Sequence, residues 1–229
     1  MPMPSNDYPN TTAAEKLAEV RGEIERAAVA AKRNPRDIQL IAVSKMQDIA
    51  AIKPLIAAGQ QIFGENRVQE AEAKWPALLE STPDIALHLI GQLQSNKADD
   101  AVAMFDAIHS IDRLSLVTAV ARAMDKKVRR PDCFVQVNIG NEPQKGGCAI
   151  EDLPALLAEA RSADLPVRGL MCVPPAEVEP APYFALLAKL AQDNGLSDLS
   201  MGMSSDYQTA VTIGATHVRV GTALFSQRA

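Results

Sequence analysis

The chain has 229 residues, 47% hydrophobic and 22% charged, which is enough to bury the core of one large domain or two small ones. Its formal net charge of -5 provides no basic field for a polyanion, and no basic patch compensates, so we expect no nucleic-acid partner. Cys133, Cys148 and Cys172 are an odd number of widely spaced cysteines, which argues against a disulfide framework or a zinc site and favours a reducing cytoplasm.

The first ten residues, MPMPSNDYPN, contain three prolines and no apolar periodicity. We expect residues 1–10 to form a flexible arm ahead of a single domain over residues 11–229. The arm lacks the basic and apolar segments of a signal peptide, and no apolar run approaches the roughly 20 residues that span a bilayer. A soluble, cytoplasmic protein without a membrane segment is therefore expected.

A helix is predicted after the arm, because Thr12 and Glu15 form a capping-box pattern and apolar residues follow at helical spacing until Asn34-Pro35. Beyond it, short β-branched runs alternate with amphipathic stretches of helical length, such as 114–127 and 150–163. A further helix is expected over 207–213. The strand candidates are IQLIAVSK, QQIFGEN, LHLIG, AIHSI, CFVQVNI, VRGLMCV, LSMGM and HVRVGTALF.

Strands that alternate with helices imply βαβ units and a parallel sheet covered by helices. Eight such units predict an α/β fold, a single (β/α)8 TIM-type barrel with an extra N-terminal helix. A doubly wound open sheet is the alternative, but it usually has a glycine-rich phosphate loop after its first strand. This chain has Ser44-Lys45-Met46-Gln47 at that point.

Lys45 is the first candidate functional residue, because ligands of such barrels bind at the C-terminal ends of the strands. The period of two places Ile41, Val43 and Lys45 on the inward face if Leu40 and Ala42 meet the helices. A lysine at that depth is poorly solvated, which favours a nucleophilic amine able to form a Schiff base with an aldehyde or ketone. The plainer alternative is a strand-end lysine that extends its amine to solvent.

The ends of the last two strands carry the pattern of an anion site. Gly202 permits a close backbone approach, Ser204 supplies a hydroxyl, and the following helix offers free N–H groups at its N-terminus. Gly221 and Thr222 end the last strand, and their N–H groups and hydroxyl can reach the same anion. The alternative role of Ser204 is an ordinary N-cap.

Two further polar residues sit at predicted strand ends. Arg219 is expected to point into the barrel, where a buried guanidinium needs partners, either a ligand or a carboxylate such as Glu65 or Asp206. Asn66 follows the second strand and could donate to a ligand oxygen or cap the next helix.

Several other residues have two interpretations each. His88 could line the pocket or be a satisfied core histidine, and Tyr207 is the one tyrosine expected near the site, with its helical face undetermined. Gln94-Ser95-Asn96-Lys97 could hold a second anion or cap its helix, and capping is slightly favoured. Cys148 follows two glycines in a position that could be exposed.

Six segments carry a family resemblance: AVSKMQ, FGENRVQEA, HLIGQLQSNK, GLMCVPP, LSMGMSSD and VRVGTALF. In this order, over residues 38–225, the chain resembles the pyridoxal 5'-phosphate (PLP) homeostasis proteins, single-domain relatives of the N-terminal barrel of alanine racemase. The resemblance implies a barrel with an extra helix and a Schiff-base lysine at Lys45. The other implied contacts are Asn66 with the ring hydroxyl, Arg219 with the pyridine nitrogen, and Ser204, Gly221 and Thr222 with the phosphate. The sequence departs from the family pattern at Leu87, where a tryptophan is common, and in the terminal FSQRA.

The resemblance also implies control of free PLP and of amino-acid and keto-acid balance. We expect a monomer that passes PLP to apo PLP-dependent enzymes, without efficient turnover. Arg219 has donors but no acceptor, so it should keep the pyridine nitrogen unprotonated and weaken the electron sink. We also expect no second domain of the kind that supplies a second acid/base in alanine racemase. The rivals are a low-activity PLP-dependent amino-acid racemase or lyase that uses the same lysine, and a cofactor-free Schiff-base aldolase.

Overall fold

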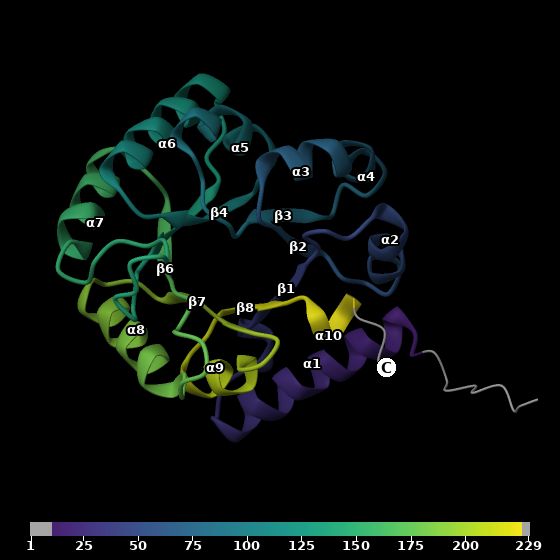
Figure 1. The fold of residues 1–229 in the computed structure, drawn as a ribbon. Coiled ribbons are helices and arrows are strands. Elements are labelled where there is room, and N and C mark those ends of the chain that lie inside the picture. The colour runs from purple at the N-terminus through teal and green to yellow at the C-terminus, as the bar shows by residue number, and fades with distance from the viewer. Residues whose placement is uncertain (1–10, 226–229) are drawn as a thin grey trace, which may run out of the picture.

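The chain folds into a closed barrel of parallel strands in the order β1 to β8, with β8 paired to β1 (Figure 1). The computed structural model describes residues 11–225, so the expected arm at 1–10 and the last residues, 226–229, lie outside the described residues. The predicted barrel is confirmed. Its strands are β1 Gln39–Val43, β2 Ile62–Glu65, β3 Ala86–Leu89, β4 Ala107–Ile111, β5 Asp132–Gln136, β6 Val167–Met171, β7 Asp198–Met203 and β8 His217–Val220.

Helices surround the barrel, and the extra helix α1 precedes β1 and packs against α2, α9 and α10 (Figure 1). The helices are α1 Ala13–Ala30, α2 Ile49–Ala57, α3 Val68–Lys74, α4 Pro76–Ser81, α5 Ala98–Met104, α6 Leu114–Lys127, α7 Leu153–Ser162, α8 Ala181–Asp193, α9 Tyr207–Ile213 and α10 Thr222–Phe225. Two short 3-10 turns are η1 Pro35–Asp37 and η2 Ser95–Lys97. None of the helices in residues 11–225 has the length and apolar character to cross a membrane.

Local sequence signals account for several helix ends. The predicted capping box is present, because Thr12 Oγ1 accepts from the Glu15 N–H at 3.2 Å and the Glu15 carboxylate accepts from the Thr12 N–H at 2.8 Å. Helices α6 and α9 have the predicted bounds, and α7 lies within the predicted 150–163. The last strand was predicted too long, since β8 ends at Val220 and α10 begins at Thr222.

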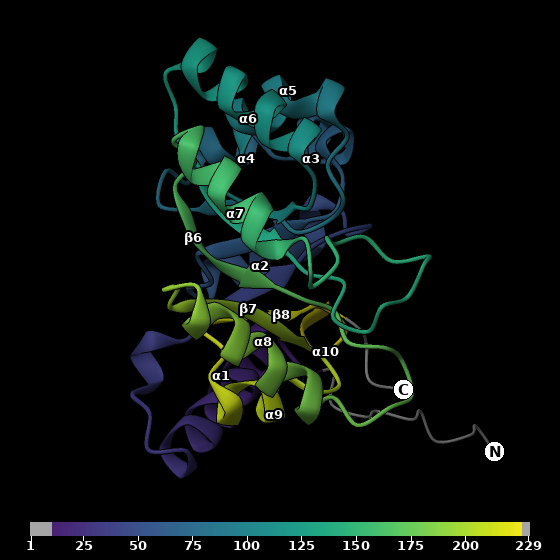
Figure 2. The same ribbon diagram turned by 90° about the vertical axis from the view of Figure 1, so that its left-hand side faces the viewer.

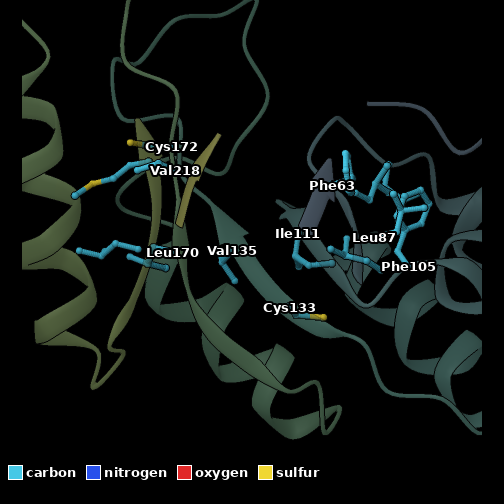
Figure 3. Packing of buried hydrophobic residues seen from close by; sticks show 14 of the residues in the cluster. Phe63, Leu87, Phe105, Ile111, Cys133, Val135, Leu170, Cys172 and Val218 are labelled. Atoms are coloured by element: carbon cyan, nitrogen blue, oxygen red, sulfur yellow. The ribbon is translucent and has the colours of Figure 1, made fainter. Parts of the chain in front are cut away.

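The main core lies between the strands and the helices. Leu40 and Ala42 of β1 belong to this core, as the alternation predicted. Figure 3 shows Phe63, Leu87 and Phe105 together in one part of it, and Leu87, at the position where a tryptophan is common, is fully buried. The three cysteines are also buried, so the exposed position considered for Cys148 is wrong.

Histidines occupy the interior of the barrel. The rings of His109 and His217 contact Phe134, at centroid distances of 4.2 and 4.9 Å, and the ring of His88 lies 5.1 Å from that of His109. Burial lowers the pKa of His88 to about 3 and that of His217 to about 4, and it also lowers the pKa of His109 well below 6.5. His88 is therefore a core histidine. No group of described residues has the composition of a metal site.

These histidines predict a dependence of stability on pH. Each is neutral in the folded protein but takes up a proton in the unfolded chain below about pH 6.5, so its contribution to folding is present above that pH and is lost as the pH falls towards about 4. The free energy of unfolding should fall by about 1.4 kcal/mol per pH unit for each histidine that titrates only when unfolded.

Denaturant titrations of the wild type and His88→Gln between about pH 7 and about pH 5 measure this slope. The slope of the free energy of unfolding against pH should be smaller in His88→Gln by the contribution of one histidine. Equal slopes for the two proteins would contradict a neutral His88 in the folded barrel.

Candidate functional site

One cavity of about 850 Å³ brings together all six candidate residues. It lies at the C-terminal ends of the strands, the end where α10 lies and from which the long loop between β5 and α7 extends (Figure 2). Val43, Ile90, Val173 and Phe225 contribute apolar walls. The candidate residues that line it are Lys45, Asn66, Ser204, Arg219, Gly221 and Thr222.

Lys45 lies in the turn that follows β1, because the strand ends at Val43. Its side chain is exposed, so the expected deep position with poor solvation is wrong. Lys45 nevertheless lines the cavity, and within residues 11–225 its amine has no ion-pair or hydrogen-bond partner. The residue therefore lies at the mouth of the barrel with an amine that no described residue engages.

Ser204 connects the ends of β7 and β8. Its Oγ accepts a hydrogen bond of 3.2 Å from the Gly221 N–H. It is not the N-cap of α9, because that position is Asp206. The Ser204 hydroxyl hydrogen and the exposed Thr222 at the start of α10 remain able to donate to a ligand in the cavity.

Gly202 allows this loop to lie close to α9. Its φ of 92° is a left-handed conformation that glycine adopts without strain. A Cβ at this position would lie 2.5 Å from Ala210 Cβ and 3.0 Å from Tyr207 Cα. Only glycine therefore lets α9 lie this close to β7. The close approach sets the course of the backbone that leads to Ser204.

Arg219 is a buried cation with neutral partners. Its guanidinium donates to Ser200 Oγ at 2.6 Å and to the Cys172 carbonyl at 2.8 Å. Burial lowers the pKa of its guanidinium below the ordinary value, yet arginine stays protonated in proteins. In the part of the chain that the structure describes, no carboxylate lies within ion-pair distance of Arg219, so the expected alternative of an internal pair is wrong.

Ser200 was missed by the sequence reasoning. Its Oγ also lies 2.8 Å from His109 Nδ1, and His109 Nε2 lies 3.1 Å from His88 Nδ1. A hydrogen-bonded chain therefore runs from the barrel interior to Arg219. The signal that could have revealed Ser200 is a polar residue inside the apolar run LSMGM.

Asn66 lies just after β2 and is half-buried at the cavity. It does not cap α3, because Arg67 holds the N-cap position and no side chain in the described part of the chain caps that helix. Gly91 keeps the neighbouring strand end close, since a Cβ there would lie 2.2 Å from the Asn66 carbonyl oxygen. Asn66 can therefore present its amide to a ligand.

Several residues considered from the sequence are used elsewhere. Tyr207 donates its hydroxyl hydrogen to Glu23 of α1, and burial and this carboxylate raise the pKa of the hydroxyl. The described residues that line the cavity do not include Tyr207. Glu65 packs in the helix layer with Lys74, and Asp206 accepts from the Met203 N–H at 2.6 Å.

The segment 94–97 contains the 3-10 turn η2, and none of its side chains caps α5, so the favoured capping interpretation is wrong. Gln94 and Lys97 line a different cavity.

Comparisons with known proteins agree with this geometry. The family model described as "Alanine racemase, N-terminal domain" matches residues 17–229. The pyridoxal phosphate homeostasis protein of Pseudomonas aeruginosa is 41% identical over 95% of this chain and 96% of its own length. The protein of the same name from Escherichia coli K12 is 37% identical over 94% of this chain and 96% of its own length.

A solved structure is similar to this chain in both sequence and fold. PipY of Synechococcus elongatus with PLP bound is 42% identical, covers 93% of this chain and 100% of its own, and superimposes with a TM-score of 0.80. Similarity at this level over nearly the whole length shows common membership of one family. The chain belongs to the pyridoxal phosphate homeostasis protein family, whose barrel is that of the N-terminal domain of alanine racemase.

Proposed function

We propose that this chain binds PLP in the cavity at the C-terminal ends of the strands and holds it through a Schiff base on Lys45. The observation that carries the proposal is two nitrogen groups in one cavity that residues 11–225 leave without an ion pair, the buried guanidinium of Arg219 and the amine of Lys45. A ligand with an anionic phosphate, a ring nitrogen that accepts a hydrogen bond and an aldehyde fits this pair. PipY, a relative at 42% identity, has been solved with PLP bound.

Each candidate residue has a role in this proposal. Ser204 and Thr222 donate to the phosphate, and Gly221 lies beside it with its N–H holding Ser204 Oγ in place. Asn66 donates to the ring hydroxyl, and Arg219 donates to the pyridine nitrogen. Arg219 has five N–H groups. Its hydrogen bonds to Ser200 and Cys172 orient the guanidinium, and the remaining N–H groups can donate to a ligand. When bound, PLP supplies an electron sink for carbanions next to its imine carbon.

The same residues favour a carrier over a racemase or lyase. Arg219 cannot protonate the pyridine nitrogen in any useful amount, because a guanidinium does not give up its proton near neutral pH. An unprotonated ring is a weak electron sink. Tyr207, the tyrosine considered as a second acid/base, directs its hydroxyl to Glu23 on α1. The cofactor-free aldolase is disfavoured by the relative that has been solved with PLP bound.

We further propose that the protein works as a monomer in the cytoplasm and passes PLP to apo PLP-dependent enzymes. Relatives that are 37% and 41% identical are named for pyridoxal phosphate homeostasis, which supports this role. Burial raises the pKa of Cys133, Cys148 and Cys172 to about 12, so these thiols are unreactive core residues compatible with a reducing compartment.

The position of Lys45 predicts where the cofactor attaches. Borohydride reduction of the PLP-loaded protein should fix the cofactor to Lys45, and Lys45→Arg, which keeps the charge but cannot form the imine, should lose the yellow absorption. Absorption spectra and mass analysis of the labelled peptide provide the measurement. Undiminished colour in Lys45→Arg, with the label on another lysine, is the result that refutes this assignment.

The joined loops after β7 and β8 predict the phosphate site. Ser204→Ala or Thr222→Ala should each remove one hydrogen bond to the phosphate, worth roughly 1.5–3 kcal/mol, or about one to two orders of magnitude in affinity. Binding of pyridoxal, which has no phosphate, should barely change. Titrations of both ligands test the site, and an equal loss for pyridoxal would place the phosphate elsewhere.

The carrier role predicts cofactor transfer without turnover. The PLP-loaded protein should activate an apo PLP-dependent enzyme, yet exchange the α-proton of L-amino acids slowly or not at all in deuterated water. NMR of the amino acids and the recovered activity of the acceptor enzyme give the two readings. Rapid α-exchange that Lys45→Ala abolishes, without cofactor transfer, would favour the racemase or lyase instead.

A further inference from the structure

The turn that bears Lys45 has a defined backbone shape. The Gln47 N–H donates to the Ser44 carbonyl at 3.1 Å, which closes the turn around Lys45 and Met46. Met46 has a φ of 60°, a left-handed conformation that is unfavourable for a residue with a side chain. A strained residue in an exposed turn persists only where the surroundings hold it.

Two side chains of α3 hold this turn. Lys74 Nζ donates to the Ser44 carbonyl at 2.8 Å and to the Gln47 carbonyl at 3.1 Å, so it contacts both ends of the turn. The Glu70 carboxylate accepts from the Met46 N–H at 2.5 Å and contacts Lys74 Nζ at 3.2 Å. The backbone on both sides of Lys45 is therefore fixed, whereas its own amine has no partner within the described residues.

A buried carboxylate fixes the position of Lys74. Glu65 is fully buried at the end of β2, and its Oε1 lies 2.8 Å from Lys74 Nζ. The same oxygen accepts from Ser44 Oγ at 2.6 Å and from Trp75 Nε1 at 2.9 Å. Apolar residues could attach α3 to the barrel as well as a buried ion pair does, so stability alone does not account for this pair.

We propose that Lys74 and Glu70, with Glu65 behind them, are positioning residues that hold the turn so that the Lys45 amine meets the aldehyde of a ligand in the cavity. The inference rests on the proposed function, because it concerns attachment at Lys45. In that step the amine nitrogen attacks the aldehyde carbon, the C=N bond forms and one water molecule leaves. A shift of the attacking nitrogen by about 1 Å costs a large part of the benefit of proximity.

The test separates attachment from binding. Pyridoxamine phosphate has the phosphate and ring of PLP but an amine in place of the aldehyde, so it occupies the same cavity without forming the imine. Glu70→Ala removes the acceptor of the Met46 N–H, and Lys74→Met removes the contacts to both carbonyls. The matched control is Glu72→Ala, the same change at an exposed position of the same helix.

Glu70→Ala and Lys74→Met should weaken PLP binding and slow the appearance of the yellow colour by about ten-fold or more, while pyridoxamine phosphate binds as in the wild type. Glu72→Ala should leave both ligands unchanged. The half-exposed Glu70 gives a readable variant even if Lys74→Met fails to fold.

Two outcomes would overturn the positioning role: an equal loss for PLP and pyridoxamine phosphate, or no change for either ligand in Glu70→Ala. A wild-type protein that carries no borohydride label at Lys45 would instead refute the proposed function itself, so the two failures are distinguishable.

Discussion

The buried guanidinium of Arg219 is the constraint on which the rest of the site depends. A permanent charge inside a barrel costs several kcal/mol unless polar groups surround it. Here the neighbours are neutral, the hydroxyl of Ser200 and the carbonyl of Cys172, which come from β7 and the end of β6. Neutral acceptors orient the guanidinium, and the Asp206 carboxylate stabilises its charge only from beyond ion-pair distance. The site therefore favours a ligand that brings a further acceptor.

The histidines in the barrel interior, next to Arg219, are subject to the electrostatic constraint that its charge imposes. A second cation close to the guanidinium would be repelled, and the histidines of the interior are neutral because burial, with a smaller contribution from neighbouring charges, lowers their pKa values. His109 links Ser200 to His88 by contacts of 2.8 and 3.1 Å. The polar interior therefore orients Arg219 without adding charge to it.

The barrel and the gathering of the candidate residues at one cavity could be predicted, because alternating strands and helices bring the C-terminal ends of all strands to one side. Lys45 and Thr222 thus lie at the same end of the barrel although they are far apart in sequence. The depth of Lys45 could not be predicted, because its turn is set by Lys74, 30 residues from Ser44, and local alternation carries no information on that contact. The direction of Tyr207 likewise depends on how α1 docks, and the partners of Arg219 depend on which strands are neighbours.

The proposed attachment of PLP to Lys45, with Arg219 facing the ring, would suit storage of the cofactor rather than stabilisation of carbanions. This account depends on the protonation state of the pyridine nitrogen. ¹⁵N NMR of the protein loaded with ¹⁵N-labelled PLP measures that state directly. The account predicts an unprotonated pyridine nitrogen in the wild-type protein and a protonated one in Arg219→Glu. A nitrogen already protonated in the wild-type protein at neutral pH would contradict it.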